Sequence, residues 1–480
     1  MKSELSSNSS VKTLLASKYF YLFFGIFASV VLYFVLIQLG LDYLPAVTAA
    51  ITALTVIWWV SEALPIPATS LVPFALLPLF GVIDHKAAAF ALGSHVILLL
   101  MGAFVLSKAL ERCGVHERLA IYMIRFVGLS SGKRLVFAFM LASAMLSMWI
   151  SNTATTLILL PIALAILAKI DNKTLACALI LGIAYAASLG GVATPIGTPP
   201  NVIFMAVYQE NVGKEMGFLT WMKIGVPIVL LSLPLMALWL TRNVRTSLDI
   251  ELPKLDAWRS DEKRVLAVFG LTALAWITRQ EPFGGWTGLF GLKGVGDSTI
   301  ALAAVVIMFM MPDGRKDHAN GGKQGRLMDW ETAQTIPWGM LLLFAGGIAI
   351  AKGFVASGLS GMLGDWLSSL SAIPVVAMIL VIGLVVTYLT EITSNTATAT
   401  LLLPILAAAA ISIDLDPLIF MIPATICASC AFMLPVATAP NAIAYGTNML
   451  QIKDMVREGF ILSLLTVGVT TAVCYFMLVR

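Results

Sequence analysis

Several stretches of this chain are far longer than an ordinary buried helix and contain no charged residue. Two of them run from Leu135 to Ala168 and from Thr174 to Gln209. Hydrophobic residues make up 59% of the 480 residues and charged residues only 12%, about half the share in a soluble protein. A soluble chain of this composition could not cover its core with polar surface. The continuous runs also differ from the alternating segments of a membrane β-barrel, so we expect an all-α polytopic membrane protein.

The positions of the apolar runs predict eleven transmembrane helices, since a crossing helix needs about 20 apolar residues. We expect them at 20–39, 45–63, 68–82, 91–110, 174–208, 222–241, 264–280, 298–312, 337–356, 417–447 and 459–479.

Two further apolar stretches, 135–168 and 366–413, fit re-entrant hairpins better than crossings. The first lies between the basic residues Lys133 and Lys173, which suggests that both of its ends are on one side of the membrane. Two helical arms of about 15 residues would each reach only ~23 Å, short of the ~30 Å hydrocarbon core. The second stretch likewise allows one arm of hairpin length on either side of its middle, and Glu391 is its only charged residue.

The distribution of Lys and Arg predicts the orientation. With the N-terminus inside, the predicted cytoplasmic segments hold 23 of the 30 basic residues. We therefore expect residues 1–18 to form a cytoplasmic tail and the C-terminus to lie outside. The basic residues occupy short loops between apolar runs, so they indicate no nucleic-acid partner. Five predicted crossings separate the two hairpins. Because this number is odd, the two hairpins are expected to enter the membrane from opposite faces.

The chain contains an internal repeat. The sequence Ser-Asn-Thr-Ala-Thr at 151–155 recurs at 394–398, an offset of 243. The segment 193–201, rich in Pro, Gly and Thr and ending in Asn, is echoed at 434–441. Upstream, Gly102, Lys108 and Gly114 match residues at an offset of 244. Because the equivalent hairpins enter from opposite faces, the repeat is inverted, which is typical of secondary transporters with a site near the membrane midplane.

The Ser-Asn-Thr motifs suit an anion site. Ser, Asn and Thr are strong N-cap residues, so each hairpin tip is expected to begin a helix. Free backbone N–H groups and the positive end of the helix dipole would then face the middle of the protein and bind an anion without Lys or Arg. Hydroxyl and amide side chains could also hold carboxylate oxygens.

Interrupted helices near each tip suit cations. Glycines and prolines interrupt the run 174–208 midway, and unwound backbone exposes carbonyl oxygens that bind small hard cations such as Na⁺. Ser147 lies four residues before Ser151, and Thr390 has the same relation to Ser394, so each pair can face one side of a helix. We expect two symmetry-related cation sites, whose charge would offset the burial of an anion.

Other functions have weaker support. Gly358 to Gly361 fit the GxSG motif of intramembrane serine proteases, but only His95 is available as a partner on a facing span. The chain has no HExxH motif and no P-loop, so neither an enzyme nor self-contained ATP-driven transport is expected. A channel would be expected to show a polar or charged ring. Glu391, within the membrane beside the second motif, is a candidate for supporting the site or sensing protons.

These motifs resemble those of the divalent anion/sodium symporter family, the INDY-like dicarboxylate transporters. The resemblance implies a homodimer in a bacterial inner membrane that imports C4 dicarboxylates with two or more Na⁺ by an elevator mechanism. Sulfate, citrate and dicarboxylate exchange are the alternatives. It also implies two domains, with scaffold parts at 19–128 and 262–365 and transport parts at 134–242 and 366–480.

The resemblance further implies site residues. One Na⁺ would lie near Ser147, Ser151, Asn152 and Gly197. A second would lie near Thr390, Thr393, Asn395 and Ala437. The residues implied to meet the substrate carboxylates are Asn152, Thr153, Thr198, Ser394, Asn395, Thr396 and Thr438. Two positions bordering the pocket differ from the family pattern, namely Thr198, where Ser is common, and Ala439, where Pro is common.

Overall fold

The computed structural model describes residues 2–170, 172–246, 255–292, 294–316, 324–362 and 373–479. The described chain is mostly helical, in agreement with the predicted class. Eight of its helical segments are long and apolar enough to cross a membrane. This supports a multi-pass membrane protein, while the total of eleven crossings stays a prediction. Residues 363–372, where the second hairpin was predicted to begin, lie outside the described residues.

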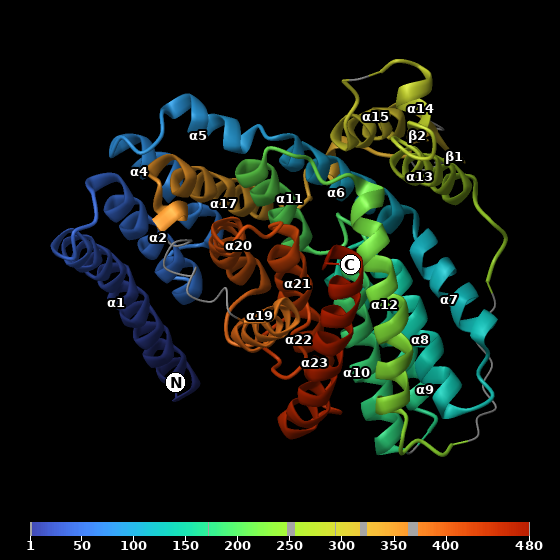
Figure 1. Cartoon of the computed structure of the whole chain (residues 1–480). Helices are drawn as coiled ribbons and strands as arrows, with labels where there is room; N and C mark the ends of the chain where they lie inside the picture. Colours follow the sequence, from blue (N-terminus) through green and yellow to red (C-terminus); the bar gives the residue numbers. More distant parts are fainter. Residues whose placement is uncertain are drawn as a thin grey trace.

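The first part of the chain begins at the left of Figure 1 and runs across its top to the right-hand side. Its helices are α1 (Lys2–Gln38), α2 (Tyr43–Ser61), α3 (Ile66–Thr69), α4 (Val72–Leu79), α5 (His85–Leu92), α6 (His95–Cys113) and α7 (Val115–Val127). Only 11% of the apolar window in α1 is buried, and α1 packs mainly on α2. Apolar side chains so exposed would face lipid. The predicted span 68–82 is divided between the two short helices α3 and α4.

The two predicted hairpins are pairs of helices joined by short turns. The first pair is α8 (Gly132–Ser147) and α9 (Asn152–Leu167), and the second is α19 (Val375–Thr390) and α20 (Asn395–Ser412). Three of these four helices have 16 residues and α20 has 18, close to the arm length estimated from the sequence. Both turns fall at a Ser-Asn-Thr motif, which places the two motifs at equivalent points of the repeat.

Each hairpin is followed by an interrupted helix. After the first come α10 (Lys173–Gly190), one 3-10 turn (Gly191–Ala193) and α11 (Pro199–Val212). After the second come α21 (Leu418–Ala428) and α22 (Ala439–Gly446). The window of α10 and the following turn is 94% buried, so this helix lies inside the protein and packs against α8. The remaining long helices of this part are α12 (Phe218–Leu240) and α23 (Ile452–Cys474), the latter ending in a π-helical turn (Tyr475–Val479).

The segment that follows α12 lies partly at the upper right of Figure 1, from its first helix to the short strands, while its last helix lies left of centre. It contains α13 (Ser260–Ile277), α14 (Gly285–Leu289), α15 (Asp297–Met310), α16 (Trp330–Ala333) and α17 (Trp338–Ser357). A short antiparallel β-hairpin, β1 (Pro312–Lys316) and β2 (Gln324–Arg326), was not predicted. The helices α6 and α17, here called the arm helices, are equivalent in the repeat. The first packs against α15, and the second packs against α11.

Candidate functional site

The two hairpin tips, Ser151–Thr153 and Ser394–Thr396, are capped in the same way. The Oγ of Ser151 accepts a hydrogen bond from the backbone N–H of Ala154 at 3.2 Å, and the Oγ of Ser394 accepts one from Ala397 at 3.1 Å. Both serines have extended backbone dihedrals, as N-cap residues do. The helices α9 and α20 therefore begin at the tips, as the N-cap chemistry predicts.

Behind the first tip, four oxygen atoms come together. The Oγ of Ser147 lies 2.6 Å from both the Oδ1 of Asn152 and the carbonyl oxygen of Ala187. The same Oδ1 lies 3.2 Å from the carbonyl oxygens of Ala187 and Gly197. Turning the amide would let its nitrogen donate to these acceptors. The turned orientation satisfies these acceptors without a cation. With the amide oxygen toward them, the four oxygens are the type of ligand that a small hard cation such as Na⁺ takes.

The second tip repeats this arrangement. The Oγ1 of Thr390 lies 2.8 Å from the Oδ1 of Asn395 and 3.0 Å from the carbonyl oxygen of Ala428, the two possible acceptors of its one proton. Ser147 and Thr390 are both fully buried. Thr393, also expected at the second cation, instead shares a hydrogen bond of 2.6 Å with Thr398. The two carbonyl oxygens, from Ala187 and Ala428, were not predicted from the sequence.

The interrupted segments are held by two equivalent asparagines. The Nδ2 of Asn201 donates to the carbonyl oxygens of Gly191 and Thr194, at 3.1 and 2.8 Å. The Nδ2 of Asn441 donates to those of Ala431 and Leu434, at 3.1 and 3.0 Å. Both amides are fully buried. Each asparagine therefore closes the non-helical loop beside its own tip, which gives the repeated Asn a structural role.

Glu391 has no counterpart in the first repeat, where Met148 stands at the equivalent position. Its carboxylate is 2% exposed and accepts hydrogen bonds from the backbone N–H groups of Phe432, Met433 and Leu434, at 2.6, 2.8 and 3.0 Å. These donors compensate the buried charge. Glu391 thus fixes the second interrupted segment, a supporting role that the sequence left open beside proton sensing.

A cavity of about 510 Å³, here called the tip cavity, is lined by both hairpin tips and by both interrupted segments. Of the residues expected at the substrate or the cations, it contacts Ser151, Asn152, Thr153, Gly197, Thr198, Asn395, Thr396, Ala437 and Thr438. Thr198 also shares a 3.4 Å hydrogen bond with Ser429 of the other repeat. Ser147, Thr390 and Thr393 lie outside its lining, as does Ser394, the one predicted substrate residue that does not contact it.

The arm helices supply a wall of the tip cavity that sequence reasoning did not anticipate. Phe104, Lys108 and Glu111 of α6 contact it, with Met340 and Phe344 of α17. The Nζ of Lys108 lies 2.6 Å from the Oε2 of Glu111, so the two charges compensate each other. The repeat had marked Lys108 as equivalent to a second lysine, but a repeated residue alone does not reveal that it faces a cavity.

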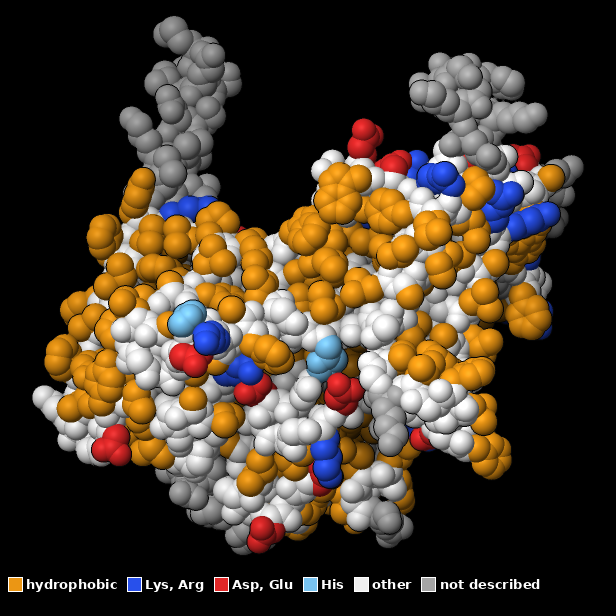
Figure 2. Space-filling view, turned by 90° about the horizontal axis from the view of Figure 1, so that it is seen from above, with side chains coloured by type: hydrophobic (Ala, Val, Ile, Leu, Met, Phe, Trp, Pro, Cys, Tyr) orange, Lys and Arg blue, Asp and Glu red, His pale blue; other side chains and the backbone are white. Residues whose placement is uncertain are grey.

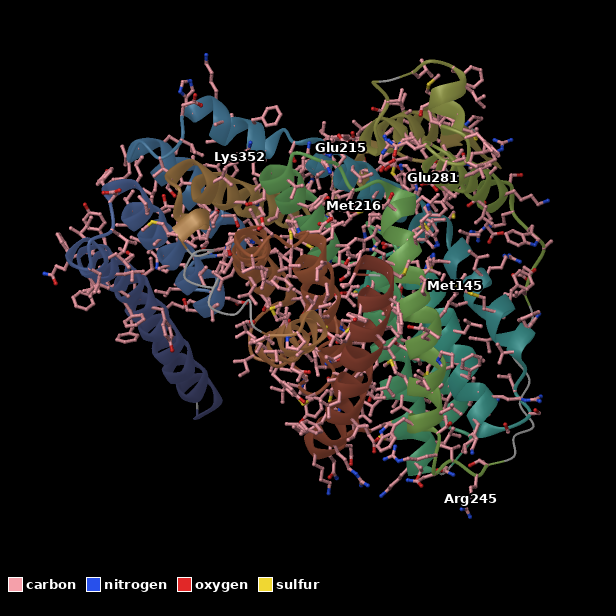
Figure 3. All side chains as sticks on the ribbon, viewed as in Figure 1. Met145, Glu215, Met216, Arg245, Glu281 and Lys352 are labelled. Carbon is pink, nitrogen blue, oxygen red and sulfur yellow. The ribbon has the colours of Figure 1, made fainter. Side chains whose placement is uncertain are left out.

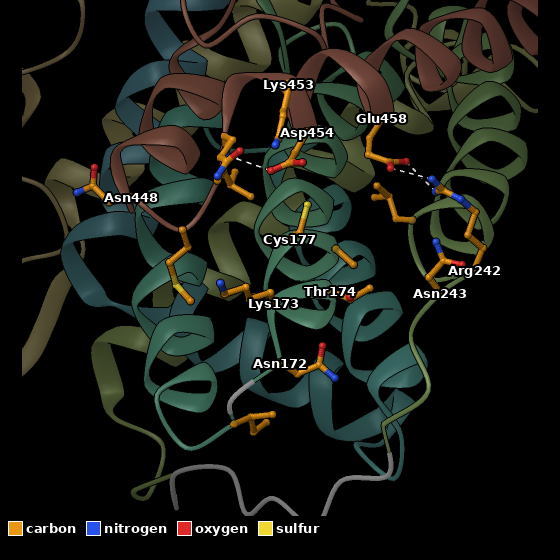
Figure 4. A pocket seen from close by; sticks show the side chains of 17 residues that line it. Asn172, Lys173, Thr174, Cys177, Arg242, Asn243, Asn448, Lys453, Asp454 and Glu458 are labelled. Atoms are coloured by element: carbon orange, nitrogen blue, oxygen red, sulfur yellow. Dashed lines mark hydrogen bonds and ion pairs between the residues drawn. The ribbon is translucent and has the colours of Figure 1, made fainter.

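A larger cavity of about 690 Å³ lies away from the tips (Figure 4). It is bordered by the first residues of α10 and α23 and by the end of α12. Arg242 and Glu458 on its wall form an ion pair with contacts of 2.7 Å. Its lining contains no residue of either Ser-Asn-Thr motif. The smaller tip cavity is therefore the candidate site, because it contains the repeated chemistry.

Comparison with known families decides the class of this arrangement. The sequence model of a family described as citrate transporter matches residues 56–424. The chain belongs to this transporter family. The family resemblance predicted from the motifs is confirmed, and a transporter rather than an enzyme is the class of this protein.

Curated relatives cover most of the chain. It is 41% identical over 451 residues to the sodium-dependent dicarboxylate transporter SdcS of Staphylococcus saprophyticus, covering 89% of this chain and 85% of the relative. It is 37% identical to SdcS of Staphylococcus aureus strain NCTC 8325, with the same coverage.

Two solved transporters have a similar fold. The YdaH transporter of Alcanivorax borkumensis matches with a TM-score of 0.58 at 16% identity, covering 83% of this chain and 88% of that one. MtrF of Neisseria gonorrhoeae matches with a TM-score of 0.56 at 14% identity, covering 84% of each chain. At this level of identity the likeness concerns the fold alone.

Proposed function

We propose that this protein imports C4 dicarboxylates such as succinate, malate and fumarate together with Na⁺. The observation that carries the proposal is the tip cavity, in which two equivalent tips from the two repeats contact one shared space. A ligand with a carboxylate at each end matches two such tips. The names of the SdcS relatives support the same substrate class and ion.

Two Na⁺ ions would bind behind the tips. The first would take oxygens of Ser147, Asn152 and Gly197, with the carbonyl of Ala187 added by the structure and Ser151 close by. The second would take oxygens of Thr390 and Asn395 and the carbonyl of Ala428, with Ala437 and Thr393 as further candidates. Because Asn152 and Asn395 also line the tip cavity, a bound cation would orient the amides that meet the substrate.

The tip residues would hold the substrate without a free basic side chain. Asn152 and Thr153 would meet one carboxylate, and Asn395 and Thr396 the other, with Thr198 and Thr438 beside them. The lysine in the wall, Lys108, is already paired with Glu111. Na⁺ and the two helix N-termini would therefore balance most of the substrate charge, which favours a dianion over a trianion.

Movement between the two sides would follow an elevator mechanism. In this proposal 134–242 and 366–480 form the moving transport unit, and 19–128 and 262–365 form the scaffold of a homodimer. The N-terminus would be cytoplasmic and the C-terminus outside. The tip cavity contacts the part of α6 near Lys108 and Glu111, which the orientation places toward the cytoplasm. The cavity would then correspond to the inward-facing state.

Uptake of labelled succinate into proteoliposomes, with and without an inward Na⁺ gradient, tests this function. We expect uptake that depends on Na⁺ and needs no internal dicarboxylate. A requirement for internal dicarboxylate would indicate an exchanger instead.

Competition decides the substrate. Unlabelled fumarate and malate should compete strongly with labelled succinate, while acetate should not. The family description favours citrate as the second candidate. Stronger competition by citrate or sulfate than by fumarate and malate would contradict the two-ended model.

A further inference from the structure

The arm helices carry one pattern of residues twice. At the offset of 244 that relates these parts of the repeat, the α6 residues Leu100, Phe104 and Lys108 match the α17 residues Phe344, Ile348 and Lys352. In each helix the three residues are four apart, so they form a stripe along one face. Each stripe ends in a lysine.

The two stripes have different neighbours in this structure. All three residues of the α6 stripe line the tip cavity, whereas of the α17 stripe only Phe344 does. On α17, Ile348 and Lys352 line a second cavity of about 260 Å³, whose opposite wall is α11. The residues of α11 and its end that contact it are Ala206, Gln209, Glu210 and Gly213. One arm lysine therefore faces the tips, and the other faces the end of α11.

The two lysines also differ in their partners. Lys108 pairs with Glu111 of its own helix. The Nζ of Lys352 lies 2.9 Å from the Oε2 of Glu210, which belongs to the proposed transport unit. The side chains of Lys352 and Glu210 are 16% and 25% exposed, and the lysine also lies over the ring of Phe90. The Lys352–Glu210 pair therefore joins the proposed scaffold to the proposed transport unit.

A second contact crosses at the same face. The Nε2 of His95, at the start of α6, lies 3.8 Å from the Oε1 of Glu215 in the chain after α11. Figure 3 labels Lys352 and Glu215 near the upper edge of the molecule, on the side opposite Arg245. Seen from above, charged and histidine side chains gather in the middle of this face between apolar borders (Figure 2). In the proposed orientation this is the outer face.

We propose that the Lys352–Glu210 ion pair is a lock that keeps the outer face closed. The pair opens when the transport unit moves outward, and Lys352 then lines the outward-facing substrate cavity as Lys108 lines the tip cavity here. This inference rests on the elevator mechanism proposed above. When the transport unit moves, its tips pass from the α6 stripe to the α17 stripe. This movement takes Glu210 away from Lys352 and brings the substrate next to Lys352.

The lock makes a prediction about populations. Removing one partner of a partly buried ion pair leaves the other charge without compensation, so the closed state loses stability relative to the open one. Glu210→Gln and Lys352→Met should each increase the outward-facing population. The charge swap Glu210→Lys with Lys352→Glu keeps the pair and should return the population toward that of the parent protein.

Cysteine labelling measures these populations. Ile348→Cys reports the outer side, because Ile348 is 5% exposed here and would line the outward cavity. Phe104→Cys reports the inner side. A membrane-impermeant maleimide is applied to intact cells for the first reporter and to inverted vesicles for the second. The parent chain, whose native cysteines include four that are buried, provides the blank.

The expected result is a rise of at least about fivefold in the outside labelling rate of Cys at 348 in each single variant, with a fall at 104. The charge swap should reverse both changes. Arg112→Met is the matched control, because Arg112 pairs with Asp329 at 2.5 Å within the proposed scaffold. It should leave the labelling rate at 348 unchanged.

Two outcomes would overturn the lock. One is an unchanged labelling rate at 348 in both single variants, and the other is opening that the charge swap does not reverse. The elevator mechanism is tested separately, with each reporter cysteine in a chain that keeps both Glu210 and Lys352. In this chain, adding Na⁺ and succinate should change the labelling rates of the two reporters in opposite directions. If that change occurs but the Glu210 and Lys352 variants have no effect, the elevator mechanism holds and only the lock is wrong.

Discussion

The hydroxyl groups behind the tips are the side chains most directly tied to the proposed Na⁺ coupling. Thr390 is fully buried, and its Oγ1 contacts both the Asn395 amide and the carbonyl of Ala428. Thr390→Ala removes this oxygen from the proposed second cation. We expect the Na⁺ concentration for half-maximal succinate uptake to rise about fivefold, since one such contact is worth about 1 kcal/mol.

Thr390→Ser provides the control for this prediction. Serine occupies the equivalent position in the first repeat, where Ser147 makes the same two contacts. The variant keeps the hydroxyl and should stay within about twofold of the parent in its Na⁺ dependence. Wild-type Na⁺ dependence in Thr390→Ala would place the second cation elsewhere.

The same residues show what could be predicted from the sequence and what could not. Ser147 and Thr390 were proposed because each lies four residues before a Ser-Asn-Thr motif that recurs at one offset, and Asn152 and Asn395 stand within those motifs. The carbonyl oxygens of Ala187 and Ala428 could not be found this way, because every residue has a carbonyl and alanine gives no signal. The place of Lys108 in the cavity wall likewise depends on how α6 packs, which no local pattern determines.

At the scale of elements, the interrupted helix beside the first tip depends on close backbone contact. A Cβ on Gly197 would lie 2.5 Å from the carbonyl oxygen of Gly191 and 2.8 Å from its Cα. These are backbone atoms that cannot move alone. Gly197→Ala should therefore displace the loop that supplies the Gly197 carbonyl, and we expect it to abolish most succinate uptake and to lower the melting temperature of the purified protein.

Gly270→Ala is the matched control, because nothing lies within 4 Å of a Cβ at that position in α13. Alanine is a better helix former than glycine, so this variant should keep or slightly raise the melting temperature and keep uptake. Normal uptake by Gly197→Ala would show that the loop does not need this close contact.

Element boundaries were predictable where residues with a strong local preference occur. Ser151 and Ser394 begin helices because they cap them, and the glycines and prolines after Gly190 interrupt one because they cannot continue it. The β-hairpin of β1 and β2 has no such signal, since its strands are short, polar and without alternation. Its strands follow from their pairing with each other rather than from local preference.

At the scale of the whole molecule, the internal repeat relates most of the site residues in pairs. It pairs the tips, the asparagines Asn201 and Asn441, and the lysines of the two arms. The exceptions are informative, because Glu391 holds only the second loop and Lys352 alone reaches across to α11. In the proposed alternating-access mechanism, the two similar halves would occupy different states at any one time. The arm lysines, which have different partners in this structure, are where the halves would differ in this way.

The last prediction concerns the topology on which the inverted repeat depends. Lys133 and Lys173 are exposed residues at the two ends of the first hairpin that lie away from its tip. Lys214 is exposed after α11. If the hairpin re-enters, cysteines introduced at 133 and 173 should both react with an impermeant maleimide in inverted vesicles and not in intact cells. A cysteine at 214 should show the opposite pattern. Reaction of 133 and 173 from different sides would make 135–168 a true crossing, and the two hairpins could no longer be related by an inverted repeat.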